Sequence, residues 1–161
     1  MHAAERGTVK VARAHGQADI DTVRVLFREY ARSLPVDLEY QGFSAELRAL
    51  PGAYAPPSGA LLIARSAAAA IGCIAVRPID ARTCEMKRLY VRPAHRGTGA
   101  GGLLVDAAVS AARACGYQEM WLDTLPGMTD AHALYLRRGF REIAPYGGPA
   151  APGTRYLGLR L

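Results

Sequence analysis

The sequence predicts a single domain over residues 1–161 of the α+β (mixed α/β) class, with a mostly antiparallel central sheet flanked by helices. The chain has 161 residues, a length typical of one hydrophobic core. Half of its residues are hydrophobic, so this core needs no disulfide or metal to support it. Short apolar runs and segments with helical spacing follow in the order β-α-α-β-β-β-α-β-α-β-β, which indicates one central crossover.

The first half is expected to hold a strand, two helices and three strands. They cover residues 8–14, 19–33, 44–50, 59–65, 69–79 and 83–93. Asp19 is the expected N-cap of the longer helix, because its carboxylate can accept hydrogen bonds from the first backbone amides. Pro35 ends that helix and Pro93 ends the last strand of this half. A turn at Ser66–Ala67 predicts that the strands on either side of it are antiparallel.

The second half begins with the glycine-rich run 96–102. We expect a helix from about Gly99 to Cys115, then a strand, a helix, and two strands. The last four cover residues 119–125, 129–138, 140–146 and 154–161. Thr129 is the expected cap of the shorter helix. Cys115 is expected in the core, because it shares one helix face with Leu104 and Ala108.

Charge and cysteine content limit the function classes. The formal net charge is +6, but the basic residues are spread along the chain, and no basic run of five or more stands out. A small phosphate-bearing ligand explains this charge as well as DNA does, and we expect no nucleic-acid partner. Three scattered cysteines and four scattered histidines predict reduced thiols, a cytoplasmic location and no metal site. No apolar run reaches membrane-spanning length, and the N-terminus lacks a signal-peptide pattern.

The run RGTGAGG (96–102) has the chemistry of a phosphate-binding loop. Glycine lets backbone amides approach an anion, and a helix N-terminus adds positive potential. A Walker loop is excluded because no Lys follows the glycines. The dinucleotide pattern G-x-G-x-x-G is met by Gly97, Gly99 and Gly102, with Asp123 about 20 residues on. However, five residues separate Val91 from the first glycine, and the chain that follows is too short for a six-stranded parallel sheet.

A third pattern, R-x-x-G-x-G, is met by Arg96, Gly99 and Gly101. It resembles the acyl-CoA loop of the GNAT superfamily of N-acetyltransferases. The run CEMKRLYVRPAHRGTGAGGLLVDAA resembles that family's strand, loop and helix, and AHALYLRRGF (131–140) resembles its second signature. The resemblance is strongest over 83–140, and it implies a GNAT-like fold. It also implies transfer of an acetyl group from acetyl-CoA to a primary amine.

The resemblance also implies roles for residues around the loop. Backbone groups of Leu89, Tyr90 and Val91 would bind the pantetheine arm as an added strand. The pyrophosphate would be surrounded by Arg96, Gly97, Thr98, Gly99, Ala100 and Gly101.

Tyr135 stands where the family often places a tyrosine beside the CoA sulfur, and it is the expected general acid. Glu85 is the expected base for the acceptor amine, and Asp123 is a second carboxylate candidate. Met128 replaces the asparagine that often begins the second signature, so no side-chain amide contact is expected there. His95 adjoins the loop. No cysteine is paired in sequence with a histidine, which favours direct transfer in a ternary complex over an acyl-cysteine.

The acceptor side is expected in residues 33–59, where Asp37, Glu39 and Tyr40 could attract a cationic amine. Tyr146, in the loop 145–153, is expected to point inward from the opposite side. The acceptor itself, a small molecule or a peptide amine, is not identified. The alternative is a non-catalytic sensor that binds acyl-CoA. A homodimer stays open, because no apolar stripe singles out an interface.

Overall fold

A computed structural model describes residues 7–161 and contains the predicted succession of strands and helices. The strands are β1 (Val9–Arg13), β2 (Ala60–Ser66), β3 (Ala69–Pro78), β4 (Thr83–Val91), β5 (Glu119–Thr124), β6 (Arg141–Glu142) and β7 (Arg155–Arg160). The helices are α1 (Gly16–Ser33), α2 (Phe43–Ala49), α3 (Ala100–Ala114) and α4 (Thr129–Arg137). The element order and the mixed α/β class predicted from the sequence are therefore confirmed.

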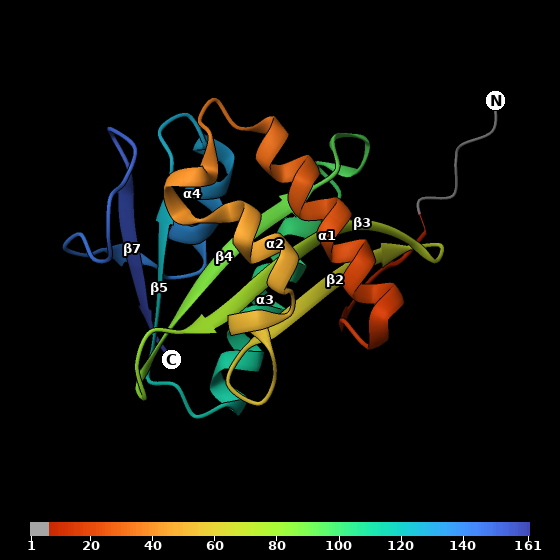
Figure 1. The fold of residues 1–161 in the computed structure, drawn as a ribbon, viewed down its shortest axis with the longest axis horizontal. Helices are drawn as coiled ribbons and strands as arrows, with labels where there is room; N and C mark the ends of the chain where they lie inside the picture. The colour runs from red at the N-terminus through yellow and green to blue at the C-terminus, as the bar shows by residue number, and fades with distance from the viewer. Residues whose placement is uncertain (1–6) are drawn as a thin grey trace.

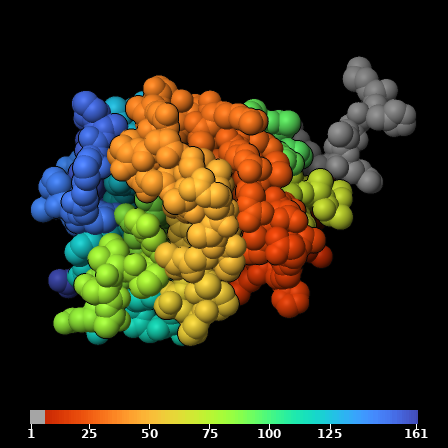
Figure 2. Space-filling model, viewed as in Figure 1, coloured from red at the N-terminus to blue at the C-terminus, as the bar shows by residue number. Residues whose placement is uncertain are grey.

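The seven strands form one sheet in the order β1-β2-β3-β4-β5-β7-β6. Neighbouring strands are antiparallel, except that β4 and β5 run parallel. Helix α3 is the crossover that this parallel pair requires. Helices α1 and α2 cover one face of the sheet and α3 covers the other (Figure 1). In the space-filling view of the first face, residues of α1, α2 and the segment between them cover much of the sheet (Figure 2).

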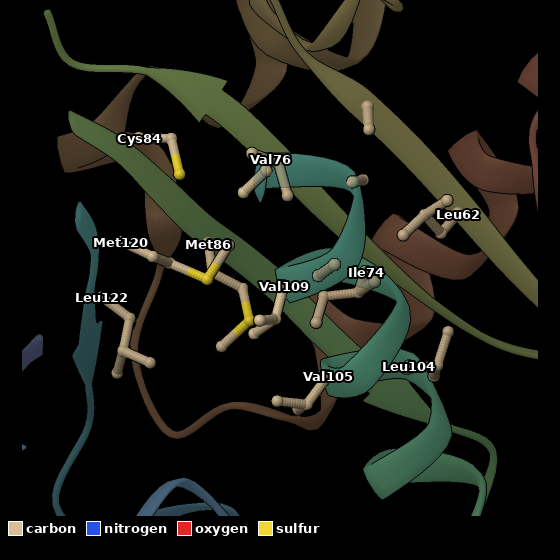
Figure 3. Close-up of a cluster of buried hydrophobic side chains, with 14 of the residues drawn as sticks. Leu62, Ile74, Val76, Cys84, Met86, Leu104, Val105, Val109, Met120 and Leu122 are labelled. Atoms are coloured by element: carbon tan, nitrogen blue, oxygen red, sulfur yellow. The ribbon is translucent and has the colours of Figure 1, made fainter. Parts of the chain in front are cut away.

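Strands β2 and β3 are largely apolar on both faces because each face of the sheet is covered. One buried cluster joins the sheet to α3 and includes Leu62, Ile74, Met86 and Leu104 (Figure 3). A second cluster on the opposite face joins the sheet to α1 and α2. Alternate residues of β2 supply the two clusters, with Leu62 in the first and Ile63 in the second. Strands buried on both faces form near-continuous apolar runs, which is the pattern seen in residues 60–64.

Strand β4 contains a β-bulge at Arg88 and Leu89. The register runs from Lys87 opposite Ala75 to Tyr90 opposite Cys73, so two residues of β4 face one residue of β3. Arg88 has φ of 62°, a conformation that costs a non-glycine residue about 1 kcal/mol or more. Before the bulge Met86 contributes to the α3 cluster, whereas after it Leu89 packs on that cluster. The bulge therefore exchanges the faces to which odd and even residues point.

Both predicted helix caps were wrong. Helix α1 begins at Gly16 after His15, and the Asp19 carboxylate accepts a hydrogen bond from the His15 backbone amide at 2.8 Å. Asp19 therefore acts from inside the first turn, as the acidic residue of a capping box does. Helix α4 does begin at Thr129, but its N-cap is Met128.

Three further expectations need correction. Cys115 is exposed and not in the core, because α3 ends at Ala114 and Cys115 lies beyond the part of the helix that packs on the sheet. Its thiol donates to the Pro57 carbonyl. The strand expected over 140–146 is paired only over Arg141–Glu142, since proline and glycine follow closely. The turn between β2 and β3 lies one residue later, at Ala67–Ala68, and both residues have positive φ.

Within residues 7–161, no helix is both long enough and apolar enough to cross a bilayer. In the same part of the chain, no three His, Cys, Asp or Glu side chains are grouped so that they could hold a metal ion. His2 lies outside the described residues.

Candidate functional site

The sheet opens between β4 and β5. These strands are paired only where Thr83–Glu85 meets Glu119–Trp121. From there they separate toward the end of the molecule that carries α4 (Figure 1). Within the described residues, Leu89, Tyr90 and Val91 have no strand partner on the β5 side. An extended ligand with amide groups can hydrogen-bond to such an edge as an added strand does.

The glycine-rich turn lies at the end of β4 and leads into α3. Gly97 and Gly99 have φ of 75° and 86°. The first helical hydrogen bond runs from the Leu103 amide to the Gly99 carbonyl at 3.1 Å, so the amides of residues 100–102 project from the helix end. A Cβ at Gly97 or Gly99 would meet no heavy atom within 4 Å in residues 7–161. The turn therefore combines free amide donors, a helix N-terminus and open space, which together suit a phosphate.

Side chains of this turn are engaged with the turn itself. Arg96 donates from Nε to the Val91 carbonyl at 3.0 Å. Thr98 donates from Oγ1 to the His95 carbonyl at 2.6 Å. These bonds fix the turn against the end of β4, so its capacity for an anion rests mainly on backbone amides.

Arg138 brings a further positive charge to the start of α3. A Cβ added at Gly102 would meet the Arg138 guanidinium, which is the end of a flexible side chain and would have to shift. Arg138 pairs with Asp106 at 2.8 Å. The pair links α4 to α3 beside the glycine-rich turn.

A cleft lies where β4 and β5 separate. Its walls come from β4, β5, α4, and the segment that joins α1 to α2. Of the residues singled out from the sequence, five line it: Tyr40, Leu89, Asp123, Met128 and Tyr135. Residues from distant parts of the sequence, including Tyr30, Gln41 and Thr124, complete the lining.

Tyr135 is 6% exposed and lies on α4, with its ring 5.8 Å from that of Phe140. Burial raises the pKa of its phenol above the ordinary value. Tyr135 therefore stays protonated at neutral pH and can donate a proton within the cleft. Leu89, on the β4 edge, lines the same cleft.

Glu85 does not line the cleft and lies at the last position where β4 and β5 are paired. It is 4% exposed. Its Oε1 accepts from Arg77 at 2.8 Å, and its Oε2 accepts from the Tyr146 hydroxyl at 2.6 Å. Lys87 Nζ is 3.9 Å from Oε1. Tyr146 thus points toward Glu85 and does not line the cleft, while both carboxylate oxygens of Glu85 already have protein partners.

Asp123 has a different environment. It lies on β5, lines the cleft, and makes no ion pair or hydrogen bond within the described residues. Burial raises its pKa, whereas the nearby Lys87 lowers it, and the net shift is upward. Asp123 is therefore a carboxylate that faces open space without a partner of its own.

Sequence reasoning missed Lys87 and Arg88 as cleft residues. Arg88 is buried and forms an ion pair with Glu46 at 3.0 Å. It also donates to Gln41 at 2.9 Å and lies over the Phe43 ring. These contacts offset the cost of its backbone conformation. The sequence signal for these cleft residues was the adjacent pair Lys87–Arg88, because two basic residues in a row break the alternation of polar and apolar residues along 83–87.

The acceptor candidates of residues 33–59 separate in the structure. Tyr40 lines the cleft. Asp37 instead caps the short 3₁₀ turn Leu38–Gln41 by accepting from the Glu39 amide at 2.9 Å. Glu39 accepts from the Ser44 amide at 2.9 Å and from its hydroxyl. Asp37 and Glu39 therefore hold local structure.

The cysteines are poorly suited to carry an acyl group. Cys73 and Cys84 are fully buried. Burial raises the pKa of both thiols, to about 12 for Cys84. Thiolate is the reactive form, so both are unreactive at neutral pH. Cys115 contacts Pro57, and neither residue lines the cleft.

A mixed sheet that opens beside a glycine-rich helix start, with a tyrosine on the opposite wall, defines the class of N-acetyltransferases. Comparison with known proteins agrees. The family model described as "Acetyltransferase (GNAT) family" matches residues 23–140. The chain therefore belongs to this family. An uncharacterized N-acetyltransferase of Schizosaccharomyces pombe is 39% identical over 145 residues, which covers 89% of each chain.

Solved structures share the fold at lower identity. An acetyltransferase from Streptococcus agalactiae superposes with a TM-score of 0.76 at 21% identity, covering 95% of this chain and 98% of its own. The protein yncA from Salmonella typhimurium, solved with its cofactor acetyl-CoA, gives a TM-score of 0.69 at 20% identity. That match covers 94% of this chain and 93% of yncA.

Proposed function

We propose that the chain transfers an acetyl group from acetyl-CoA to a primary amine, directly, within a ternary complex. The observation that carries this proposal is the junction of the open β4 edge with the glycine-rich turn. The β4 edge fits an extended amide chain, and the glycine-rich turn that follows it fits a phosphate. Pantetheine and pyrophosphate follow one another in the same order in acetyl-CoA. The acetyl-CoA complex of yncA, which has the same fold, supports this choice of donor.

The residues present fit acetyl-CoA. Leu89, Tyr90 and Val91 would hydrogen-bond the pantetheine through their backbone groups. Backbone amides over Gly97–Gly101 would face the pyrophosphate, with Arg96 and Thr98 holding the turn in shape. Acetyl-CoA supplies the thioester, whose carbonyl carbon accepts the amine and whose sulfur leaves.

Tyr135 is the proposed general acid. Its raised pKa keeps the phenol protonated, and its place in the cleft beside Leu89 allows it to give that proton to the departing sulfur. A backbone amide near Leu89 or Val91 would stabilise the developing negative charge on the carbonyl oxygen.

Glu85 is the base that the family resemblance implies. To accept a proton from the amine it would have to give up its bond to Arg77 or to Tyr146. Those two bonds support a positioning role instead, in which Glu85 holds Tyr146 against Trp121 at a ring distance of 5.1 Å.

Titration calorimetry with acetyl-CoA, followed by an assay of thiol release with a panel of primary amines, tests the proposal. We expect saturable binding, and thiol release only when an amine is present. Binding without thiol release from any amine would support the sensor alternative. Absence of binding would overturn both, and salt-dependent retention on DNA would then favour a nucleic-acid partner.

A further inference from the structure

We propose that the acceptor is a primary amine on an apolar skeleton, with neither a carboxylate beside the amine nor a second cation, and that Asp123 receives its ammonium group. This inference rests on the acetyl transfer proposed above and names the acceptor class and a residue that contacts it. It comes from the charges and the lining of the cleft between β4 and β5.

The carboxylate of Asp123, which lines the cleft without a hydrogen-bond or ion-pair partner among the described side chains, points to a cation as ligand. Of the two basic residues that line the cleft, Arg88 lies 3.0 Å from Glu46, and Lys87 lies 3.9 Å from the Glu85 oxygen that also accepts from Arg77. Asp123 has no ion-pair partner within residues 7–161. A partly buried carboxylate without a partner is costly. A ligand ammonium would supply the missing positive charge, whereas a carboxylate beside the amine would be repelled.

Aromatic and apolar side chains surround this carboxylate. Tyr30 and Tyr40 approach from α1 and from the segment after it, and Leu38 is buried beside them. Tyr30, Tyr40 and Asp123 line the same cleft. Such walls favour a hydrocarbon skeleton and can also attract a cation through the ring faces. A second cationic centre would meet Lys87 and Arg88 instead.

The position of Asp123 suits the chemistry. It lies on the β5 wall, while Leu89 lies on the facing β4 wall and Tyr135 lines the same space. The ammonium would give one proton to the Asp123 carboxylate, whose pKa is raised by burial. The free amine would then form the C–N bond as the C–S bond breaks. Tyr135 protonates the departing thiolate. The second proton, which the nitrogen loses as it becomes an amide, restores the Tyr135 phenol, and Asp123 later releases its proton to solvent.

Three probes on the full chain test the acceptor class: 2-phenylethylamine, phenylalanine and 1,4-diaminobutane. The first two share a skeleton and differ by one carboxylate. We expect kcat/KM for 2-phenylethylamine to exceed that for each of the other two by about 100-fold. This comparison uses the unmodified protein, so it does not depend on any variant folding. Equal or better turnover of phenylalanine or 1,4-diaminobutane would overturn the acceptor class.

Asp123→Asn tests the residue, with Asp130→Asn as the matched control, since Asp130 is exposed on α4 and gives the same change of charge. We expect Asp123→Asn to lower kcat/KM for 2-phenylethylamine about 100-fold while the Kd for acetyl-CoA stays within about twofold. The control should behave as the unmodified protein. Unchanged kcat/KM in Asp123→Asn would overturn the assignment and leave acetyl transfer standing.

Calorimetric binding of 2-phenylethylamine separates the two proposals. Binding that needs Asp123, without thiol release from any amine, would overturn acetyl transfer and support the ammonium site. Binding that is absent, or that is equal in Asp123→Asn, would overturn the ammonium site.

Discussion

The Tyr146 hydroxyl donates a 2.6 Å hydrogen bond to Oε2 of Glu85, which joins the C-terminal loop to the middle of the sheet. Because Glu85 is buried, loss of this donor leaves a carboxylate oxygen without a partner. We expect Tyr146→Phe to lower the free energy of unfolding by about 2 kcal/mol. Urea unfolding followed by Trp121 fluorescence measures this change.

Tyr156 provides the matched control for that variant. It belongs to the same aromatic stack, with its ring 5.4 Å from that of Tyr146. Its hydroxyl makes no hydrogen bond among residues 7–161. Tyr156→Phe should change the unfolding free energy by less than about 0.5 kcal/mol. Equal losses in the two variants would mean that stacking, and not the bond to Glu85, holds the loop.

Gly99→Asp is expected to weaken acetyl-CoA binding by on the order of 100-fold. The side chain would enter the open space beside the α3 amides and place a negative charge there. Gly147→Asp is the control, because Gly147 also has positive φ, at 79°, and is open on its Cβ side. Calorimetry should show unchanged affinity for the control, and retained affinity in Gly99→Asp would disprove the phosphate-loop assignment.

Tyr135→Phe should lower kcat by about 100-fold or more, which is the usual contribution of general acid catalysis. The Kd for acetyl-CoA should stay within about twofold, since the phenol is not proposed to hold the donor. Tyr117→Phe is the control, because the Tyr117 hydroxyl donates to the Ser58 carbonyl and Tyr117 does not line the cleft. If the two variants turn over equally fast, Tyr135 is not the acid.

Glu29→Gln is expected to destabilise the chain at neutral pH only. Its hydrogen bond with Arg92 is the main cause that lowers the pKa of Glu29, and Tyr90 and Arg32 lower it further against the opposing effect of burial. A carboxyl whose folded pKa is depressed adds stability above its unfolded pKa, and this stability is lost as the pH falls through the folded pKa. The difference between the two proteins should be about 1 kcal/mol or less at pH 7, because the pair is partly exposed.

Urea titrations from about pH 7 down to about pH 2 measure that difference. It should shrink once the pH passes below about 4, near the usual pKa of glutamate. A difference that is constant with pH would show that the Glu29–Arg92 contact acts through packing alone.

Much of the fold was predictable from the sequence because each element carries its own local signal. The apolar runs of β2 and β3 and the helical spacing of α1 depend on neighbouring residues. The two signatures around Gly99 and Tyr135 were predictable for the same reason. The helix starts were less accurate, because an acidic residue can satisfy the first amides from the cap position or from within the first turn, as Asp19 does.

The cleft lining was predictable only in part, because its residues come from distant segments: Tyr40 and Asp123 were candidates, whereas Tyr30 was not. Tyr30, Tyr40 and Asp123 meet only after α1 and β5 have packed on β4. The position of Glu85 on its strand was predictable from the local sequence. Its hydrogen bond with Tyr146 was not, because the two residues lie 61 positions apart. The left-handed backbone conformation of Arg88 was not predictable either, because glycine is the usual residue in that conformation. The ion pair with Glu46, which offsets the cost of this conformation, comes from a distant segment.

The bulge at Arg88 makes the residue count of β4 critical. If β4 kept its length but lost the bulge, regular alternation from Met86 would turn Leu89 and Tyr90 toward the sides opposite to those they now occupy. The Tyr90 ring, which now meets Tyr30 at 6.3 Å, would be driven into the α3 side. A related chain that lacks the bulge should therefore be one residue shorter between Met86 and Tyr90, because only then would both buried cores keep their side chains.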